Sequence, residues 1–182
     1  MHLLAPVVLV RDFHFSNLYG LNLVDRTCDA GYTLYHGDCQ CYKADNTFLS
    51  YFDASDKCVA DGGHLAFIKS ADQNAFLLDL CKKNGVGRDG EPWIGLRCND
   101  TVRANCKWLD GSSLTYDNFI SSELTSFFMK ERLGEPDGGS YEVYMCSEGY
   151  PECPEGYWAT PVNPGGDGPV LCQKRKRHLY HV

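Results

Sequence analysis

The residues of this chain with the most distinctive chemistry are its ten cysteines, an even number in 182 residues. Zinc sites combine closely spaced ligand pairs such as C-x2-C, and thiol-redox centres use C-x-x-C. The sequence has no such arrangement, because its one close pair is Cys39-Gln40-Cys41. The spacing therefore favours a framework of disulfide bonds formed in an oxidising compartment.

The histidines do not form a recognisable catalytic pattern. Of the six, four lie in the terminal arms, His36 lies in an expected turn, and His64 stands at an expected strand start. The sequence has no G-x-S-x-G, H-E-x-x-H or glycine-rich phosphate loop. A Cys–His nucleophile pair is the remaining enzymatic alternative, but disulfides account better for the cysteines. We do not expect an enzyme.

The charge and hydropathy of the chain restrict its partners. A net charge of −7 argues against nucleic acid, because phosphate binding favours a basic stripe. The basic run 174–177 begins a segment, 174–182, that we interpret as a solvated tail rather than a nuclear signal or a processing site. No segment is long and apolar enough to cross a bilayer, so we expect no stable membrane insertion.

The first 27 residues differ in pattern from the rest. Residues 3–10 are apolar over the length of a signal-peptide core, but no basic residue precedes them and no clear cleavage site follows. We interpret residues 1–27 as a leader or arm that includes a degenerate signal segment. An ordinary buried strand at 3–10 is the alternative interpretation.

From Cys28 onward the pattern becomes that of a folded domain. A hairpin is expected around 32–43, and two helices follow, which begin at the capping signals Ser50-x-x-Asp53 and Ser70-x-x-Gln73. A short helix is possible at 121–133 by its hydrophobic spacing. The expected strands are 64–68, 93–96, 107–109, 142–145, 157–160 and 170–172. Early helices followed by many short strands indicate an α+β fold.

Several landmarks in this order resemble the C-type lectin-like domain, in particular its invertebrate secreted type. They are Gly31-Tyr32, Cys58, Trp93-Ile94-Gly95-Leu96, Trp108, Glu135-Pro136-Asp137, Cys146, Trp158 and Cys172. The resemblance covers residues 28–173. It implies two helices that flank small antiparallel sheets, a long loop region, disulfide staples and a secreted, extracellular protein.

The resemblance also implies a set of disulfides. Cys58 and Cys172 match the bridge that closes the domain, whereas the usual partner position of Cys146 holds Asn163-Pro164. The implied pairs are Cys28–Cys39, Cys58–Cys172, Cys98–Cys106, Cys146–Cys153 and Cys41–Cys81. The sequence leaves the pairing of the cysteines other than Cys58 and Cys172 open. The sequon at Asn99, between Cys98 and Cys106, predicts N-glycosylation.

In sugar-binding members of the family, a calcium ion on the long loop coordinates the sugar. The resemblance assigns Glu135, Asp137 and Glu142 as calcium ligands, and these residues together with Trp158 as the ligand-binding set. Calcium requires six to eight oxygen ligands. The family's Asn-Asp pair after the tryptophan is replaced here by Ala159-Thr160, so we expect weak or absent calcium binding. A solvated acidic turn is the alternative interpretation of Glu135 and Asp137.

The function implied by the resemblance is a secreted recognition module that binds a glycan or glycoprotein through an incomplete calcium site. The alternative is a module of the same fold that binds a protein partner without calcium. The two differ in whether ligand binding is sensitive to calcium chelation.

Overall fold

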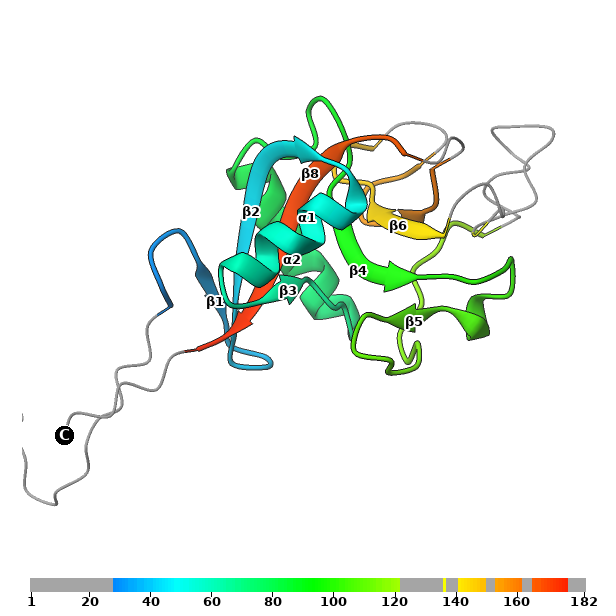
Figure 1. The fold of residues 1–182 in the computed structure, drawn as a ribbon, viewed down its shortest axis with the longest axis horizontal. Coiled ribbons are helices and arrows are strands. Elements are labelled where there is room, and N and C mark those ends of the chain that lie inside the picture. Colours follow the sequence, from blue (N-terminus) through cyan, green and yellow to red (C-terminus); the bar gives the residue numbers. More distant parts are fainter. Residues whose placement is uncertain (1–27, 122–135, 137–140, 150–152, 162–164, 177–182) are drawn as a thin grey trace, which may run out of the picture. The chain divides into compact units, whose positions relative to one another are not determined.

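A computed structural model describes residues 28–121, 136, 141–149, 153–161 and 165–176 of the chain (Figure 1). The predicted arm 1–27, the predicted helix at 121–133 after Ser121, and Glu135 and Asp137 lie outside these residues. All of the described residues belong to one unit, Arg26–Arg177.

Both predicted helices begin at the expected serine caps. Helix α1 spans Tyr51–Ala60, and the Ser50 hydroxyl accepts a hydrogen bond from the Asp53 N–H at 3.2 Å. Helix α2 spans Ala71–Lys83, and Ser70 caps the Gln73 N–H in the same way at 3.2 Å. Such side-chain caps satisfy N–H groups that have no partner within the helix.

The described strands form one connected sheet in the order β1-β2-β8-β4-β6-β7, with β3 paired to β8 and β5 paired to β4. A short 3-10 helix, η1 (Arg103–Asn105), separates β4 from β5. The strands are β1 (Thr33–Tyr35), β2 (Gln40–Leu49), β3 (His64–Leu65), β4 (Trp93–Arg97), β5 (Lys107–Trp108), β6 (Glu142–Met145), β7 (Trp158–Ala159) and β8 (Gly168–Arg175).

The α+β class and the disulfide-stapled C-type lectin-like fold are confirmed, but the strands do not form separate antiparallel sheets. Strand β4 lies parallel to β8, with Trp93 opposite Val170, and this pairing joins the β1-β2-β8 part to the β4-β6-β7 part. Figure 1 shows β8 between β2 and β4.

Alternation of side chains along the central strands divides the core between the two helices. In β8, Leu171 packs in a cluster that contains Leu77 and Leu80 of α2, whereas Val170 and Cys172 pack with residues of α1. Strand β4 alternates in the same way, because Ile94 packs in the cluster with α2 and Trp93 packs in the cluster with α1. Because successive strand side chains point to opposite faces, α1 and α2 cover opposite faces of the sheet.

The structure contains four disulfides, of which three are pairs that the resemblance implied: Cys58–Cys172, Cys98–Cys106 and Cys146–Cys153. The predictions Cys28–Cys39 and Cys41–Cys81 are wrong, because Cys28 pairs with Cys41 instead. Cys39 lies in the turn between β1 and β2 with φ of 56° and is exposed. Cys41 packs on the α1 face of β2, whereas Cys81 belongs to the cluster on the α2 face.

The last strand extends further than the sequence suggested. Strand β8 continues through Lys174 and Arg175, which pair with Cys41 and Gln40 of β2. Lys174 is buried. The strand thus includes two residues that the sequence analysis assigned to the tail, and of these Lys174 is not solvated while Arg175 is exposed. In the part of the chain that the structure describes, no helix is long and apolar enough to cross a membrane.

The two unpaired cysteines should differ in reactivity. Cys39 is exposed, whereas Cys81 is buried and burial raises the pKa of its thiol to about 12. Because the thiolate is the reactive form, we expect a maleimide to label Cys39 in the native oxidised protein and Cys81 only after unfolding. Peptide mass spectrometry would identify the labelled residues, and Cys39→Ser is the control that should abolish native labelling. A Cys28–Cys39 peptide would contradict the structure.

Candidate functional site

The predicted calcium ligand Glu142 is held by a neighbouring arginine. It begins β6 opposite Arg97 of β4, and the Arg97 Nη2 atom donates to Glu142 Oε1 at 2.9 Å. The Glu142 side chain is only 14% exposed. A carboxylate in this setting already has its charge balanced by a cation on the adjacent strand.

Trp158 occupies a structural position rather than a ligand-binding one. Its side chain is fully buried, and its indole N–H donates to Asn74 Oδ1 of α2 at 2.9 Å. The rings of Trp108, Tyr116 and Phe119 pack edge-on around it. A tryptophan with no exposed face cannot stack on a ligand, so its assignment to the ligand-binding set is wrong.

The positions after Trp158 lack the chemistry of a calcium site. Ala159 and Thr160 are both fully buried, and Ala159 lies opposite Tyr144 of β6. Among the described residues, no three histidine, cysteine or acidic side chains group in a way that could hold a metal. Of the loop tripeptide, only the buried Pro136 is described. Asn99, the predicted glycosylation site, is exposed.

The exposed surface around Glu142 is aromatic. Phe52 at the start of α1 is 60% exposed, and the Arg97 guanidinium lies over its ring at 5.2 Å from the centroid. Tyr141, next to Glu142 in the chain, is 48% exposed. An arginine beside exposed aromatic rings is common at the centre of protein interfaces. We call Phe52, Arg97, Tyr141 and Glu142 the β4/β6 surface.

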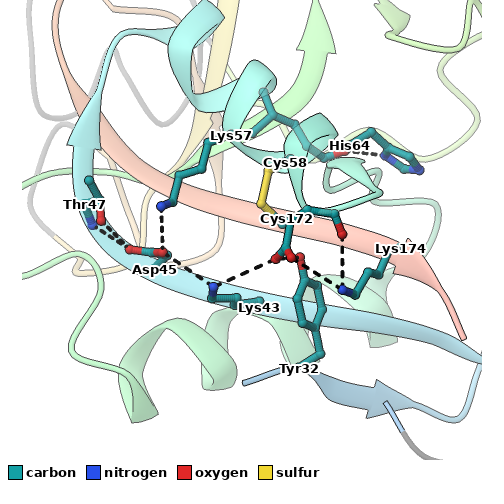
Figure 2. The surroundings of a disulfide bond; sticks show 11 residues. Tyr32, Lys43, Asp45, Thr47, Lys57, Cys58, His64, Cys172 and Lys174 are labelled. Atoms are coloured by element: carbon teal, nitrogen blue, oxygen red, sulfur yellow. Dashed lines mark hydrogen bonds and ion pairs between the residues drawn. A yellow bond between two sulfur atoms is a disulfide. The ribbon is translucent and has the colours of Figure 1, made fainter. Parts of the chain in front are cut away.

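A second polar arrangement, which the sequence analysis missed, surrounds the Cys58–Cys172 disulfide (Figure 2). Lys174 is 7% exposed at its side chain, and its Nζ atom lies 2.7 Å from Asp29 Oδ2 and 3.7 Å from Asp61 Oδ1. The same ammonium lies 3.9 Å from the Tyr32 ring centroid. The Tyr32 hydroxyl in turn donates to Asp61 Oδ2 at 2.7 Å. A buried cation is thus compensated by two carboxylates and an aromatic face.

The network continues along β2 through alternating charges. Lys43 Nζ lies 3.8 Å from Asp45 and 3.9 Å from Asp61, and Lys57 Nζ lies 3.4 Å from Asp45. Burial alone would raise the pKa of Asp45, but hydrogen bonds donated by Thr47 and the charge of Lys57 hold it below its usual value. Each charge in this network has an opposite charge beside it, so we assign it a structural role in closing the domain around the disulfide.

A half-buried carboxyl group lies elsewhere, before β4. Glu91 Oε2 accepts hydrogen bonds from the Ser147 N–H at 2.5 Å and the Ser147 hydroxyl at 2.9 Å. Burial raises the pKa of Glu91 to about 7, although the two hydrogen bonds oppose this shift. No local sequence signal predicts this contact, because the two residues are 56 positions apart.

Removal of the buried cation should destabilise the fold. We expect Lys174→Met to lower the free energy of unfolding by about 2 kcal/mol, because Asp29 and Asp61 lose their shared partner but stay partly hydrated. Lys82→Met is the matched control, since the Lys82–Glu155 pair is 2.8 Å long and about half exposed. That control should change stability by less than about 0.5 kcal/mol. Urea unfolding of both variants makes the comparison, and equal effects would contradict the structural role.

The raised pKa of Glu91 predicts a pH dependence of stability. Its pKa is higher in the folded state than in the unfolded chain. The contribution of Glu91 to the free energy of unfolding is therefore fully present below about pH 4.5 and is lost as the pH rises through about 7. Relative to wild type, Glu91→Gln should therefore be stabilised at pH 8 by about 1 to 2 kcal/mol, after allowance for partial exposure, and the difference should vanish near pH 4.5. Urea unfolding from pH 4.5 to 8 measures this, and a difference that does not change with pH would contradict the assignment.

Comparisons with known proteins agree with the fold. The family model of the lectin C-type domain matches residues 47–158, more than half of the chain. One chain of the snaclec coagulation factor IX/factor X-binding protein of Trimeresurus stejnegeri is 38% identical over 99 residues, which are 53% of this chain and 64% of the relative. The chain thus spans less than two thirds of that relative's length.

Solved structures show the same architecture. The crystal structure of CEL-IV is 25% identical with a TM-score of 0.63 and covers 85% of this chain and 97% of that one. A calcium-independent type II antifreeze protein is 23% identical with a TM-score of 0.59, and the match covers 83% of this chain and 96% of that one. With the family match over 47–158, the two helices and the mixed sheet, these comparisons show that the chain belongs to the C-type lectin domain family.

Proposed function

We propose that this chain is an extracellular recognition module that binds a protein ligand without calcium. The observation that carries the proposal is the state of Glu142, the predicted metal ligand that the structure describes, and of the residues after Trp158. Glu142 is paired with Arg97, and the residues after Trp158, at which the family places two more ligands, are a buried alanine and a buried threonine. Calcium needs an oxygen shell, and the described residues supply too few free oxygens to build one.

Other features support a protein ligand. The snaclec relative is named for binding coagulation factors, which are proteins. The lectin domain family and this relative are binding modules rather than enzymes. The similar antifreeze structure is described as calcium-independent, so this fold does not require the ion. The β4/β6 surface combines two exposed aromatic side chains with an arginine, which suits a protein interface.

The disulfides support an extracellular location. Four of them staple the domain, and such bonds form and persist in oxidising compartments. A glycan bound in a calcium-dependent manner is the principal competing function, and the experiment below is designed to separate the two.

The oxidised protein should give the same melting temperature, within about 1 °C, in about 5 mM calcium and in EDTA, because an ion that does not bind the native state cannot stabilise it. In parallel, arrays of extracellular proteins and of glycans would be probed with the chain in both buffers. We expect protein signals that survive EDTA and no glycan signal that requires calcium. Asp137→Ala is the control for residual metal binding.

A melting temperature raised by several degrees in calcium, and lost in Asp137→Ala, would overturn the proposal. A glycan signal that disappears on chelation would do the same and would restore the calcium-dependent lectin interpretation.

A further inference from the structure

A groove lies between the end of α1, the start of β3, the residues after β5 and the end of β8. Its volume is about 720 Å³. We call it the α1/β8 groove. Its lining includes Val59, Gly62, His64, Leu109, Asp110 and Arg175. It shares none of the residues of the predicted calcium set or of the β4/β6 surface.

The groove has apolar walls that come from separate elements. Val59 on α1 is 60% exposed and Leu109 after β5 is 41% exposed, and both are among the large hydrophobic side chains that the described structure leaves in solvent. Between them, the His64 ring stacks on Phe67 at 4.1 Å between centroids. Covering these side chains with an apolar group would remove their exposed surface from water, which is the main favourable term in association.

The groove also offers unused polar groups. His64 Nδ1 lies 2.7 Å from the Leu65 carbonyl oxygen and donates to it, and Nε2 forms no hydrogen bond within the described residues. Along β8, Cys172 and Gln173 pair with both β2 and β3. From Lys174 onward, in the described part of the chain, only β2 pairs with β8. Gly63 lies against Gln173 and Lys174 on the same side, so the chain itself covers the second edge of β8 as far as Lys174.

The charges in the groove leave one cation unbalanced. Lys174 is compensated by Asp29 and Asp61. Asp110 accepts hydrogen bonds from Ser112, and these bonds and the nearby charge of Lys69 hold its pKa below the usual value. Arg175 is exposed, and its guanidinium forms no ion pair or hydrogen bond within the described residues. An acidic group is the complement of such a site, because arginine can bind a carboxylate through two parallel hydrogen bonds.

We infer that the α1/β8 groove binds a segment of a protein partner that carries an aliphatic or aromatic residue next to an acidic one. The apolar side chain packs between Val59 and Leu109, and the carboxylate pairs with Arg175. This inference rests on the proposed protein-binding function and names the surface and the chemistry of the ligand.

The walls favour a peptide over a sugar. Sugars in binding sites stack on exposed aromatic faces, but Phe67 is only 8% exposed, with the His64 ring stacked against it. The side chains that the groove does expose, Val59 and Leu109, are aliphatic. Aliphatic walls beside an exposed arginine suit the apolar and acidic side chains of a polypeptide.

A phage-displayed peptide library selected on the oxidised full chain in EDTA tests the inference. We expect enriched peptides in which an apolar residue neighbours an acidic one. Their Kd should rise by about 10-fold or more for Arg175→Glu and for Leu109→Glu, since each removes a principal contact. Arg88→Glu and Val102→Glu are the matched controls, because both residues are exposed and lie outside the groove. Their Kd should stay within about 2-fold of wild type.

A charge swap makes the test specific for the ion pair. Replacing the acidic residue of a selected peptide by lysine should weaken binding to wild type and restore binding to Arg175→Glu. All four substituted side chains are solvent-exposed, and melting temperatures would show that the variants are folded.

The inference would be overturned if the selection enriches no peptide beyond those enriched in a parallel selection on the double variant Val59→Glu/Leu109→Glu. It would also be overturned if selected peptides bind the groove variants and the control variants with equal Kd. The failure of this inference is separable from failure of the proposed function. If proteins bind in EDTA and their Kd does not change with the groove substitutions, the groove inference is contradicted and the proposed function stands. Calcium-dependent glycan binding would contradict the proposed function, and the peptide selection would then report on the groove independently.

Discussion

Strand β8 is the constraint on which the rest of the structure depends. It pairs antiparallel with β2 and β3 and parallel with β4, so both halves of the sheet are joined through it. Its alternating side chains enter both hydrophobic clusters. It also carries Cys172, whose bond to Cys58 spans 114 positions, and Lys174, which closes the charged network. The last strand of the domain thus fixes the position of the first helix, and β5, β6 and β7 join the sheet through β4. Closing so long a loop removes much conformational freedom from the unfolded chain.

Placing β8 in the centre also separates the candidate binding surfaces. The β4/β6 surface lies on β4, β6 and the start of α1, whereas the α1/β8 groove lies where β8 passes the end of α1. Between them, the core is packed with aromatic rings such as Trp93 and Tyr51, whose centroids lie 5.6 Å apart at nearly a right angle. Close packing of this kind makes an interior rigid. Two surfaces on one rigid frame can therefore contact different parts of a ligand without rearrangement of the domain.

The sequence predicted the parts of the structure that depend on local chemistry or on the family pattern. Ser50 and Ser70 marked both helix starts because an N-cap is decided within three residues. Cys58–Cys172 and Cys98–Cys106 followed from the resemblance to the family, whereas Cys153 was chosen for Cys146 because the family's partner position holds Asn163-Pro164. The hairpin bridge was not predicted, because its choice between Cys39 and Cys41 depends on turn conformation and on which face of β2 each thiol occupies. The ion pair of Glu142 could not be predicted either, since its partner Arg97 is 45 positions away. Trp158 was misassigned because the same residue type serves stacking and core packing, and burial decides between them.

The way in which the described acidic residues are balanced bears directly on calcium. A calcium site collects carboxylates whose mutual repulsion the ion relieves. In the described part of this domain several carboxylates are relieved by other means. Arg97 balances Glu142, lysines balance Asp45 and Asp61, and Glu91 is held by hydrogen bonds from Ser147 with its pKa raised toward neutrality. An arginine or lysine fixed by covalent attachment balances charge at any calcium concentration, whereas a bound ion does so only above its dissociation constant. A frame whose charges are balanced in this way is consistent with the proposed recognition of a protein ligand without calcium.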